Sequence, residues 1–378
     1  MRVAHVIDAL GYGGAQKLLL TFAETARGRD LGVTIISLRP DSVPTPYPEL
    51  FNTRGSEVFE LPFRKLYDPR TIPTLIALLK KKRIDIVHTH LSHSNILGSL
   101  AGKIAGIPVV STIHNTQTDI AKRPRLLRVE RFCLRNFSTR AIAVGKNVAD
   151  IYQAIIKSDR LDVIPNAVEA GYPVSSQERV EILTELAGDP GKILLIAVGR
   201  LTEQKGYRDM LNAFAKVRER HSGALLVIVG VGPLLESLKG FSQDLDLSDH
   251  VRFLGARSDV PKLLAACDIF LNSSYWEGLS IAMLEAMAAG LPIIATSVGD
   301  AEHLLATGGG LLVNVRDPAG LAAAINCLIE DPDKIQAMGQ LASSYVEQNY
   351  AAGPWFDKLL HTYRRAKQDI TRSVGNNQ

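Results

Sequence analysis

This sequence has few cysteines, no long apolar run and no leader-like start. Its three cysteines, Cys133, Cys267 and Cys327, lie far apart. This argues against a disulfide framework or a zinc site and favours a reducing compartment. No run approaches the roughly 18 consecutive apolar residues of a transmembrane helix. The first residues, MRVAHVIDALGYGG, lack a long apolar core and a cleavage site, so no signal peptide is expected. We expect a cytoplasmic protein, with peripheral attachment to the inner face of the membrane left open.

The sequence also lacks a complete dinucleotide-binding fingerprint, G-x-G-x-x-G. The cluster that starts at Gly11 has Gln16 in the last position, and the cluster at Gly230 and Gly232 has Leu235 there. An NAD(P) oxidoreductase on two Rossmann-like halves therefore remains only an alternative.

A metal site is not indicated either. His88, His90 and His93 spell HTHLSH, and the first two would share one face of a strand. No acidic or cysteine residue follows at ligand spacing. The Asp-x-Asp pairs at 244–246 and 331–333 lie in polar stretches beside predicted helices, which favours a surface position. We expect no metal and no cofactor.

What the sequence does have is the composition of a globular protein with more than one domain. Its 378 residues are 46% hydrophobic and 22% charged. The formal net charge of +4 conceals an excess of basic residues in the first half, at 80–83 and in KRPRLLRVERFCLRNF at 122–137. The second segment predicts an amphipathic basic helix, which fits an anionic membrane or phosphorylated acceptor and an ordinary solvated surface equally well. No aromatic residues interleave in the manner of a nucleic-acid site, so we expect no nucleic-acid partner.

Short apolar runs alternate with helical segments along the whole chain, which predicts α/β architecture with parallel sheets. In the first half the expected strands are 3–7, 33–38, 84–88, 109–113 and 141–144, and the expected helices are 15–27, 72–81 and 95–105. A linker rich in Pro, Gly and Ser at 163–178 separates this half from a second, similar half. We expect two domains, residues 1–168 joined by a C-terminal helix at about 355–378, and residues 169–354.

The stretch WEGLSIAMLEAMAAGLP, residues 276–292, places two glutamates beside a predicted buried helix. Ser280 is suited to cap that helix, so Glu277 would lie on the preceding loop and Glu285 inside the helix. In a helix, the offset from Glu277 to Glu285 would span about 12 Å. This is close to the distance between the two sugars of a nucleotide sugar. One carboxylate could bind hydroxyls of the donor sugar and the other those of the ribose.

Neighbouring strand ends supply cations and glycines. Arg200 and Lys205 lie in AVGRLTEQKG, Gly230 and Gly232 lie in IVGVGP, and Arg257 lies in GARSDV. Glycines permit close backbone approach and cations bind phosphate, so these loops predict a metal-free diphosphate site.

A series of motifs follows in order over nearly the whole chain: GYGGAQ, VHTHL, STIHN, VIPNAVE, AVGRLTEQKG, VIVGVGP, VRFLG and EGLSIAMLEAMAAGLPIIAT. Together they resemble the large retaining glycosyltransferase family 4, the bacterial-type group 1 enzymes. The resemblance implies the GT-B fold, in which two Rossmann-like domains face each other across a deep cleft, the first binding the acceptor and the second the donor. It implies transfer of a hexosyl unit from a nucleotide sugar, with UDP favoured over GDP, without a metal.

The resemblance also implies roles for matching positions. The donor-side positions are these: Gly13, Gly14, Gly230 and Gly232 at the diphosphate, His114 at the sugar, Arg200 and Lys205 at the leaving group, Glu277, Gly278 and Leu279 at the sugar, Glu285 at the ribose, and Arg257 and Val260 at the base. On the acceptor side the candidates are Gln16, where many relatives have glutamate, His93 and Asp119.

The expected mechanism is a front-face displacement in which the leaving phosphate takes the acceptor's proton. The acceptor would be a glycan, a glycolipid or a small glycoside, in surface polysaccharide or glycolipid biosynthesis. Membrane contact through the basic segment 122–137 stays open. A nucleotide-sugar epimerase with the same fold stays open as an alternative, as does a non-catalytic scaffold. Intact Arg200, Lys205, Glu277 and Glu285 argue against the scaffold.

Overall fold

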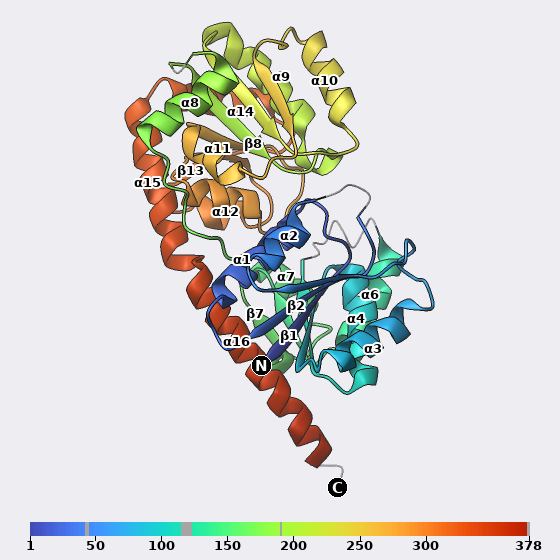
Figure 1. Cartoon of the computed structure of the whole chain (residues 1–378). Coiled ribbons are helices and arrows are strands. Elements are labelled where there is room, and N and C mark those ends of the chain that lie inside the picture. Colours follow the sequence, from blue (N-terminus) through green and yellow to red (C-terminus); the bar gives the residue numbers. More distant parts are fainter. Residues whose placement is uncertain (42–44, 115–122, 190, 376–378) are drawn as a thin grey trace. The chain divides into compact units, whose positions relative to one another are not determined.

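The computed structural model describes residues 1–41, 45–114, 123–189 and 191–375, and it divides the chain into two compact units (Figure 1). Unit 1 combines residues 1–167 with 352–378, and unit 2 is the continuous stretch 168–351. The expected boundaries, at 168 and at about 355, fall close to these positions. Within the described part of the chain, no helix is both long enough and apolar enough to cross a bilayer.

Unit 1 is built on a seven-stranded parallel sheet with the strand order β3-β2-β1-β4-β5-β6-β7. Its strands are β1 (Arg2–Ile7), β2 (Gly32–Ser37), β3 (Glu57–Glu60), β4 (Ile86–His90), β5 (Val109–Ile113), β6 (Arg140–Ala143) and β7 (Leu161–Val163). The order reverses between β1 and β4, and ligands of open parallel sheets bind beyond the carboxyl ends of the strands at such a switch point.

The helices of unit 1 include one from the far end of the chain. They are α1 (Gly14–Ala26), α2 (Tyr47–Asn52), α3 (Thr71–Lys81), α4 (Ser92–Ala105), α6 (Pro124–Asn136), α7 (Lys146–Tyr152) and α16 (Ala352–Gly375), with the 3-10 turn η1 (Ser158–Arg160). The Phe22 ring on α1 lies 4.9 Å from that of Phe356 and 6.1 Å from that of Trp355 on α16. These ring contacts pack α16 against α1 within unit 1.

Two predicted boundaries near the switch point of unit 1 are wrong by a few residues. The strand expected at 84–88 runs from Ile86 to His90, which places His90 inside the sheet. The helix expected at 95–105 begins at Ser92, because the Oδ1 atom of Asp8 accepts hydrogen bonds from the backbone N–H and the hydroxyl of Ser94, at 2.7 Å each.

Unit 2 has a six-stranded parallel sheet with the order β10-β9-β8-β11-β12-β13, which reverses between β8 and β11. Its strands are β8 (Ile193–Val198), β9 (Ala224–Val229), β10 (Val251–Gly255), β11 (Ile269–Asn272), β12 (Ile293–Thr296) and β13 (Gly310–Val313). Its helices are α8 (Ser176–Ala187), α9 (Tyr207–Arg220), α10 (Leu235–Asp244), α11 (Val260–Ala266), α12 (Ile281–Ala288), α13 (Ala301–Leu305), α14 (Pro318–Ile329) and α15 (Pro332–Asn349), with the 3-10 turn η2 (Glu203–Lys205).

Candidate functional site

The loops that follow β8 and β11 meet at the switch point of unit 2. Lys205 ends η2 after β8, and Glu277 lies in the loop after β11. The Nζ atom of Lys205 donates a hydrogen bond to Oε1 of Glu277, and both side chains are largely buried, with 19% and 12% of their surfaces exposed. The sequence predicts that Lys205 binds the leaving group and that Glu277 binds the sugar. The structure places the two residues in direct contact.

Two neighbours that the sequence analysis missed hold the Glu277 loop. The hydroxyl of Ser274 lies 2.9 Å from Oε1 of Glu277, and Nε2 of Gln204 donates to the Trp276 carbonyl at 2.9 Å. The available signal was weak: polar residues that directly follow an apolar strand face the carboxyl edge of the sheet.

Glycines let these loops pack against one another. A Cβ atom on Gly230, whose φ is 144°, would lie 2.0 Å from the Gly199 carbonyl oxygen. A Cβ atom on Gly232 would lie 2.3 Å from the Leu201 carbonyl oxygen. The predicted role of both glycines was close approach of a phosphate. The structure supplies another reason for them, which is close approach of a second backbone segment.

The remaining donor-side candidates lie around this edge of the sheet. Arg200 is exposed, and its side chain forms no ion pair within the described residues. Arg257 makes two hydrogen bonds to the Asp259 carboxylate, at 2.8 and 2.7 Å. Val260 is the first residue of α11. The guanidinium of Arg257 is therefore held in place directly before that helix.

The predicted cap of the two-glutamate helix is confirmed. The hydroxyl of Ser280 accepts a hydrogen bond from the Met283 backbone N–H at 3.4 Å, and α12 then runs over Ile281–Ala288 with Glu285 inside it. Gly278 and Leu279 precede the cap, and the Gly278 carbonyl accepts from the Asp300 N–H at 3.2 Å.

In unit 1 the glycine loop between β1 and α1 is closed by Gln16. Its Nε2 donates to the Ala9 carbonyl at 2.8 Å, and a Cβ atom on Gly13 would lie 2.7 Å from its Oε1. Gln16 is buried, so its amide shapes the loop that carries Gly13 and Gly14. Asp119, the other acceptor candidate beside His93, lies outside the described residues.

Asp8 is the functional candidate that the sequence analysis overlooked. It directly follows β1, and its Oδ2 lies 2.9 Å from Nδ1 of His93 on the first turn of α4. The two residues straddle β1 and β4, the switch point of unit 1. A lone aspartate after an apolar strand was the only signal in the sequence.

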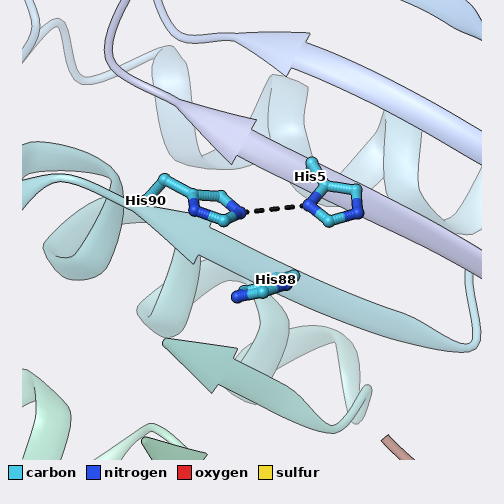
Figure 2. A group of neighbouring side chains, drawn as sticks. All are labelled: His5, His88 and His90. Atoms are coloured by element: carbon cyan, nitrogen blue, oxygen red, sulfur yellow. Dashed lines mark hydrogen bonds between the residues drawn. The ribbon is translucent and has the colours of Figure 1, made fainter. Parts of the chain in front are cut away.

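Three histidines form a buried row along β1 and β4 (Figure 2). The Nδ1 of His5 lies 3.0 Å from Nε2 of His90. His88 uses both ring nitrogens, at 2.6 Å from the Tyr363 hydroxyl and 2.7 Å from the Thr112 hydroxyl. Burial lowers the pKa of His5 to about 3 and holds the pKa values of His88 and His90 well below their usual range.

This row has the residue types of a metal site, but both ring nitrogens of His88 already have hydrogen-bond partners. The ring nitrogens come within 4.8 Å of one another, and the His88 and His90 rings are tilted by 37°, with centroids 4.1 Å apart. A metal ion needs imidazole lone pairs that converge in the ring planes. The third histidine of the row is His5, whereas His93 pairs with Asp8.

His114 follows β5, and its ring centroid lies 6.4 Å from that of His90. Burial lowers its pKa to about 4, so its imidazole is neutral near pH 7.

On α6, the fully buried Glu130 accepts a hydrogen bond from Nδ2 of Asn95 on α4 at 2.8 Å. Burial raises the pKa of Glu130 to about 7.

Models of known protein families match both units of the chain. Residues 12–171 match the family model described as Glycosyltransferase Family 4, and residues 179–344 match that of glycosyl transferases group 1. UDP-Gal:alpha-D-GlcNAc-diphosphoundecaprenol alpha-1,3-galactosyltransferase of Escherichia coli is 30% identical over 277 residues, covering 70% of this chain and 71% of that protein. N-acetyl-alpha-D-glucosaminyl L-malate synthase of Bacillus anthracis is 26% identical over 341 residues, 87% of each chain.

Solved structures show the same fold. The crystal structure of HepE from Anabaena in complex with UDP and glucose superposes with a TM-score of 0.84 at 22% identity, covering 95% of this chain and 98% of that chain. The chain therefore belongs to glycosyltransferase family 4, has the GT-B fold and is a glycosyltransferase that uses a nucleotide sugar.

Proposed function

We propose that this enzyme moves a hexosyl unit from a UDP-sugar to an acceptor hydroxyl with retention of configuration and without a metal. The observation that carries the proposal is the Lys205–Glu277 pair at the switch point of unit 2. The exposed Arg200 lies in the same loop, shortly before η2. A diphosphate leaving group develops negative charge, and fixed cations stabilise it as a metal would. A carboxylate beside them accepts hydrogen bonds from sugar hydroxyls.

In the proposed reaction the bond between the anomeric carbon and the diphosphate oxygen breaks, and a bond to the acceptor oxygen forms on the same face. The acceptor's proton moves to the departing phosphate oxygen. Lys205 and Arg200 neutralise that phosphate, Glu277 holds the sugar, and the neutral imidazole of His114 contacts it. No side chain has to act as a covalent nucleophile.

The remaining contacts with the donor come from residues in or near the loops that follow the strands of each sheet. We propose that Glu285 binds the ribose, that the segment from Arg257 to Val260 contacts the base, and that the backbone around Gly13 lies near the diphosphate. The uracil base is favoured because the Escherichia coli relative is named for UDP-Gal and HepE was solved with UDP-glucose.

For the acceptor we propose a lipid-linked saccharide at an anionic membrane surface, as in surface polysaccharide or glycolipid biosynthesis. The Escherichia coli relative is named for a diphosphoundecaprenol-linked sugar. In this chain, α6 exposes Val129 and Phe132 among arginines that include Arg125, Arg128 and Arg135. Exposed apolar and cationic side chains on one helix are typical of interfacial binding.

A thermal-shift panel tests the donor proposal with UDP, GDP, NAD and common UDP- and GDP-sugars, each with and without EDTA. A ligand at about 100 times its dissociation constant stabilises the folded state by roughly 2.7 kcal/mol. We expect UDP and one UDP-sugar to raise the midpoint regardless of EDTA. A shift with NAD alone, or one that EDTA abolishes, contradicts the proposal.

The product then separates transfer from epimerisation. The selected UDP-sugar is incubated with the enzyme and methyl glycosides, and the coupling constant of the new anomeric proton is measured. A new α-glycoside from an α-linked donor supports retention. An altered nucleotide sugar without a new glycoside identifies an epimerase.

A further inference from the structure

The Asp8–His93 pair occupies the same position in the first sheet that the Lys205–Glu277 pair occupies in the second. Asp8 follows β1 and His93 follows β4, the strands between which the order reverses. This edge of unit 1 is where an open parallel sheet binds its ligand. The lysine pair suits a diphosphate, whereas a carboxylate holding an imidazole suits a hydroxyl.

The carboxylate of Asp8 fixes both the position and the tautomer of the imidazole. Its Oδ1 accepts from the Ser94 N–H and hydroxyl, each at 2.7 Å, which anchors the first turn of α4. Its Oδ2 lies 2.9 Å from Nδ1 of His93. A carboxylate accepts hydrogen bonds, so the neutral ring carries its proton on Nδ1 and leaves Nε2 as an acceptor.

That Nε2 atom is open to a ligand. The side chain of His93 is 20% exposed, and Nε2 makes no hydrogen bond within the part of the chain that the structure describes. The exposed Tyr67 ring lies 5.5 Å from the His93 ring and flanks it. Leu91, just before α4, has a φ of 72°, a conformation that a bulky residue rarely adopts outside functional sites.

Capping of α4 does not account for the histidine. Asp8 anchors the first turn through its two bonds to Ser94, and His93 adds a side chain whose outer nitrogen faces no protein partner among the described residues. An imidazole held at one nitrogen by a carboxylate and free at the other is a common arrangement for contacting a substrate hydroxyl.

We propose that Nε2 of His93 accepts a hydrogen bond from a non-reacting hydroxyl of the acceptor, and that Asp8 is the residue that positions this imidazole. The inference rests on the proposed function and adds the acceptor side to it. The bond holds the acceptor in place, and the reacting hydroxyl keeps its own proton for transfer to the departing phosphate. The pair therefore governs acceptor binding and leaves donor binding unaffected.

Three variants test this kinetically, with methyl glycosides as acceptors and water as the reference acceptor. His93→Asn keeps a hydrogen-bond donor near Asp8 but removes Nε2. It should raise the KM for the glycoside at least about tenfold, with hydrolysis of the UDP-sugar within about twofold of wild type. His93→Gln, whose amide reaches the Nε2 position, should recover part of the loss. His361→Asn, at an exposed position on α16, is the matched control.

Either of two kinetic results overturns the proposal. The first is an unchanged glycoside KM in His93→Asn, which would make the histidine structural. The second is an equal loss of UDP-sugar hydrolysis, which would place the pair on the donor side.

Nitrogen NMR of the histidine side chains decides the matter without turnover. In the free enzyme His93 should be the Nδ1–H tautomer, and Asp8→Asn, which can present an amide donor to Nδ1, should shift it toward Nε2–H. Methyl glycosides should move the His93 resonances in wild type and less so in Asp8→Asn. If wild type neither hydrolyses nor transfers any UDP-sugar, the proposed function fails, and this titration still decides the role of His93. An Nε2–H tautomer, or no response to any glycoside, overturns the inference.

Discussion

The ammonium group of Lys205 donates a hydrogen bond to the carboxylate of Glu277 between the loops that follow β8 and β11. Each charge is largely buried and therefore depends on the other for its stability. Arg200, in the same loop as Lys205, is exposed and forms no such pair within the described residues. Substitution of the two cations should therefore distinguish an effect on catalysis from an effect on the stability of the fold.

We expect Lys205→Ala and Arg200→Ala each to lower kcat/KM for transfer by about 100-fold, because each removes charge that stabilises the leaving phosphate. Only Lys205→Ala should also lower the free energy of unfolding, by about 2 kcal/mol, since it leaves the buried Glu277 carboxylate without a cation. Steady-state kinetics and urea unfolding measure both effects. Equal stability losses in the two variants would contradict the role assigned to the pair.

Gly230 and Gly240 offer a matched pair of glycine substitutions in unit 2. Gly230→Ala would force a Cβ atom to 2.0 Å from the Gly199 carbonyl in a left-handed backbone conformation. It should destabilise the protein by more than about 2 kcal/mol. Gly240 lies inside α10 with no atom within 4 Å of an added Cβ, so Gly240→Ala should stabilise by about 0.5–1 kcal/mol. Thermal unfolding of the two variants provides the comparison.

The buried histidine row should make unit 1 sensitive to acid. His5 is held neutral in the folded state, with a pKa lowered to about 3, whereas the unfolded chain binds a proton near its usual pKa of about 6.5. The unfolded state therefore binds more protons, and each such histidine removes about 1.4 kcal/mol of stability per pH unit below about 6.5. His5→Leu/His90→Leu should flatten the fall in unfolding free energy between about pH 6.5 and 5. His361→Leu, at the exposed site, should leave that slope unchanged.

The pH dependence of stability that Glu130 contributes should be opposite in sign to that of the histidines. Its folded pKa is raised from the ordinary 4.5 to about 7, so the native state holds the proton longer than the unfolded state does. The corresponding stability is fully present below about pH 4.5 and is lost as the pH rises through about 7, by about 3 kcal/mol in total. Glu130→Gln should remove that decline, measured as urea unfolding at about pH 5 and about pH 8. Glu60→Gln, at an exposed position ending β3, serves as its control.

The membrane proposal depends on the exposed face of α6. Val129 and Val163 are each 50% exposed, on α6 and on β7 respectively. Val129→Ser combined with Phe132→Ser should weaken binding to vesicles that contain anionic lipid by about tenfold, because two apolar side chains leave the interface. Val163→Ser should have no effect. Flotation at low and high salt measures both, and equal binding by all variants would refute the proposal.

The strand and helix pattern of both sheets was predictable, because parallel strands buried on both faces read as apolar runs. The edge strands β3, β7 and β13 were missed. They are short, and their burial is less complete, so their runs are less apolar. Glu277 and Lys205 were predictable from motifs, but their contact was not, since it joins residues 72 positions apart.

Asp8 is the clearest case of a long-range contact that a local sequence pattern cannot predict. It moves the start of α4 from the predicted position 95 to Ser92 through bonds to Ser94, which lies 86 positions further along the chain. Without that carboxylate, SHSN is an unremarkable stretch of loop, and His93 is one polar residue among several. The same long-range contact turns His93 from a weak candidate into an oriented side chain.

The return of α16 to unit 1 sets an order of assembly. Unit 2 is one continuous stretch, 168–351, whereas unit 1 lacks one of the two hydrogen-bond partners of His88 until Tyr363 has been made. Domains generally fold as units during synthesis once their chain is available. The second unit is thus complete on the ribosome before the first, and for that interval the face of the first sheet around Phe22 and His88 has no helix over it. A nascent chain stalled before residue 352 should accordingly show a protease-resistant second unit and a chaperone-binding first one.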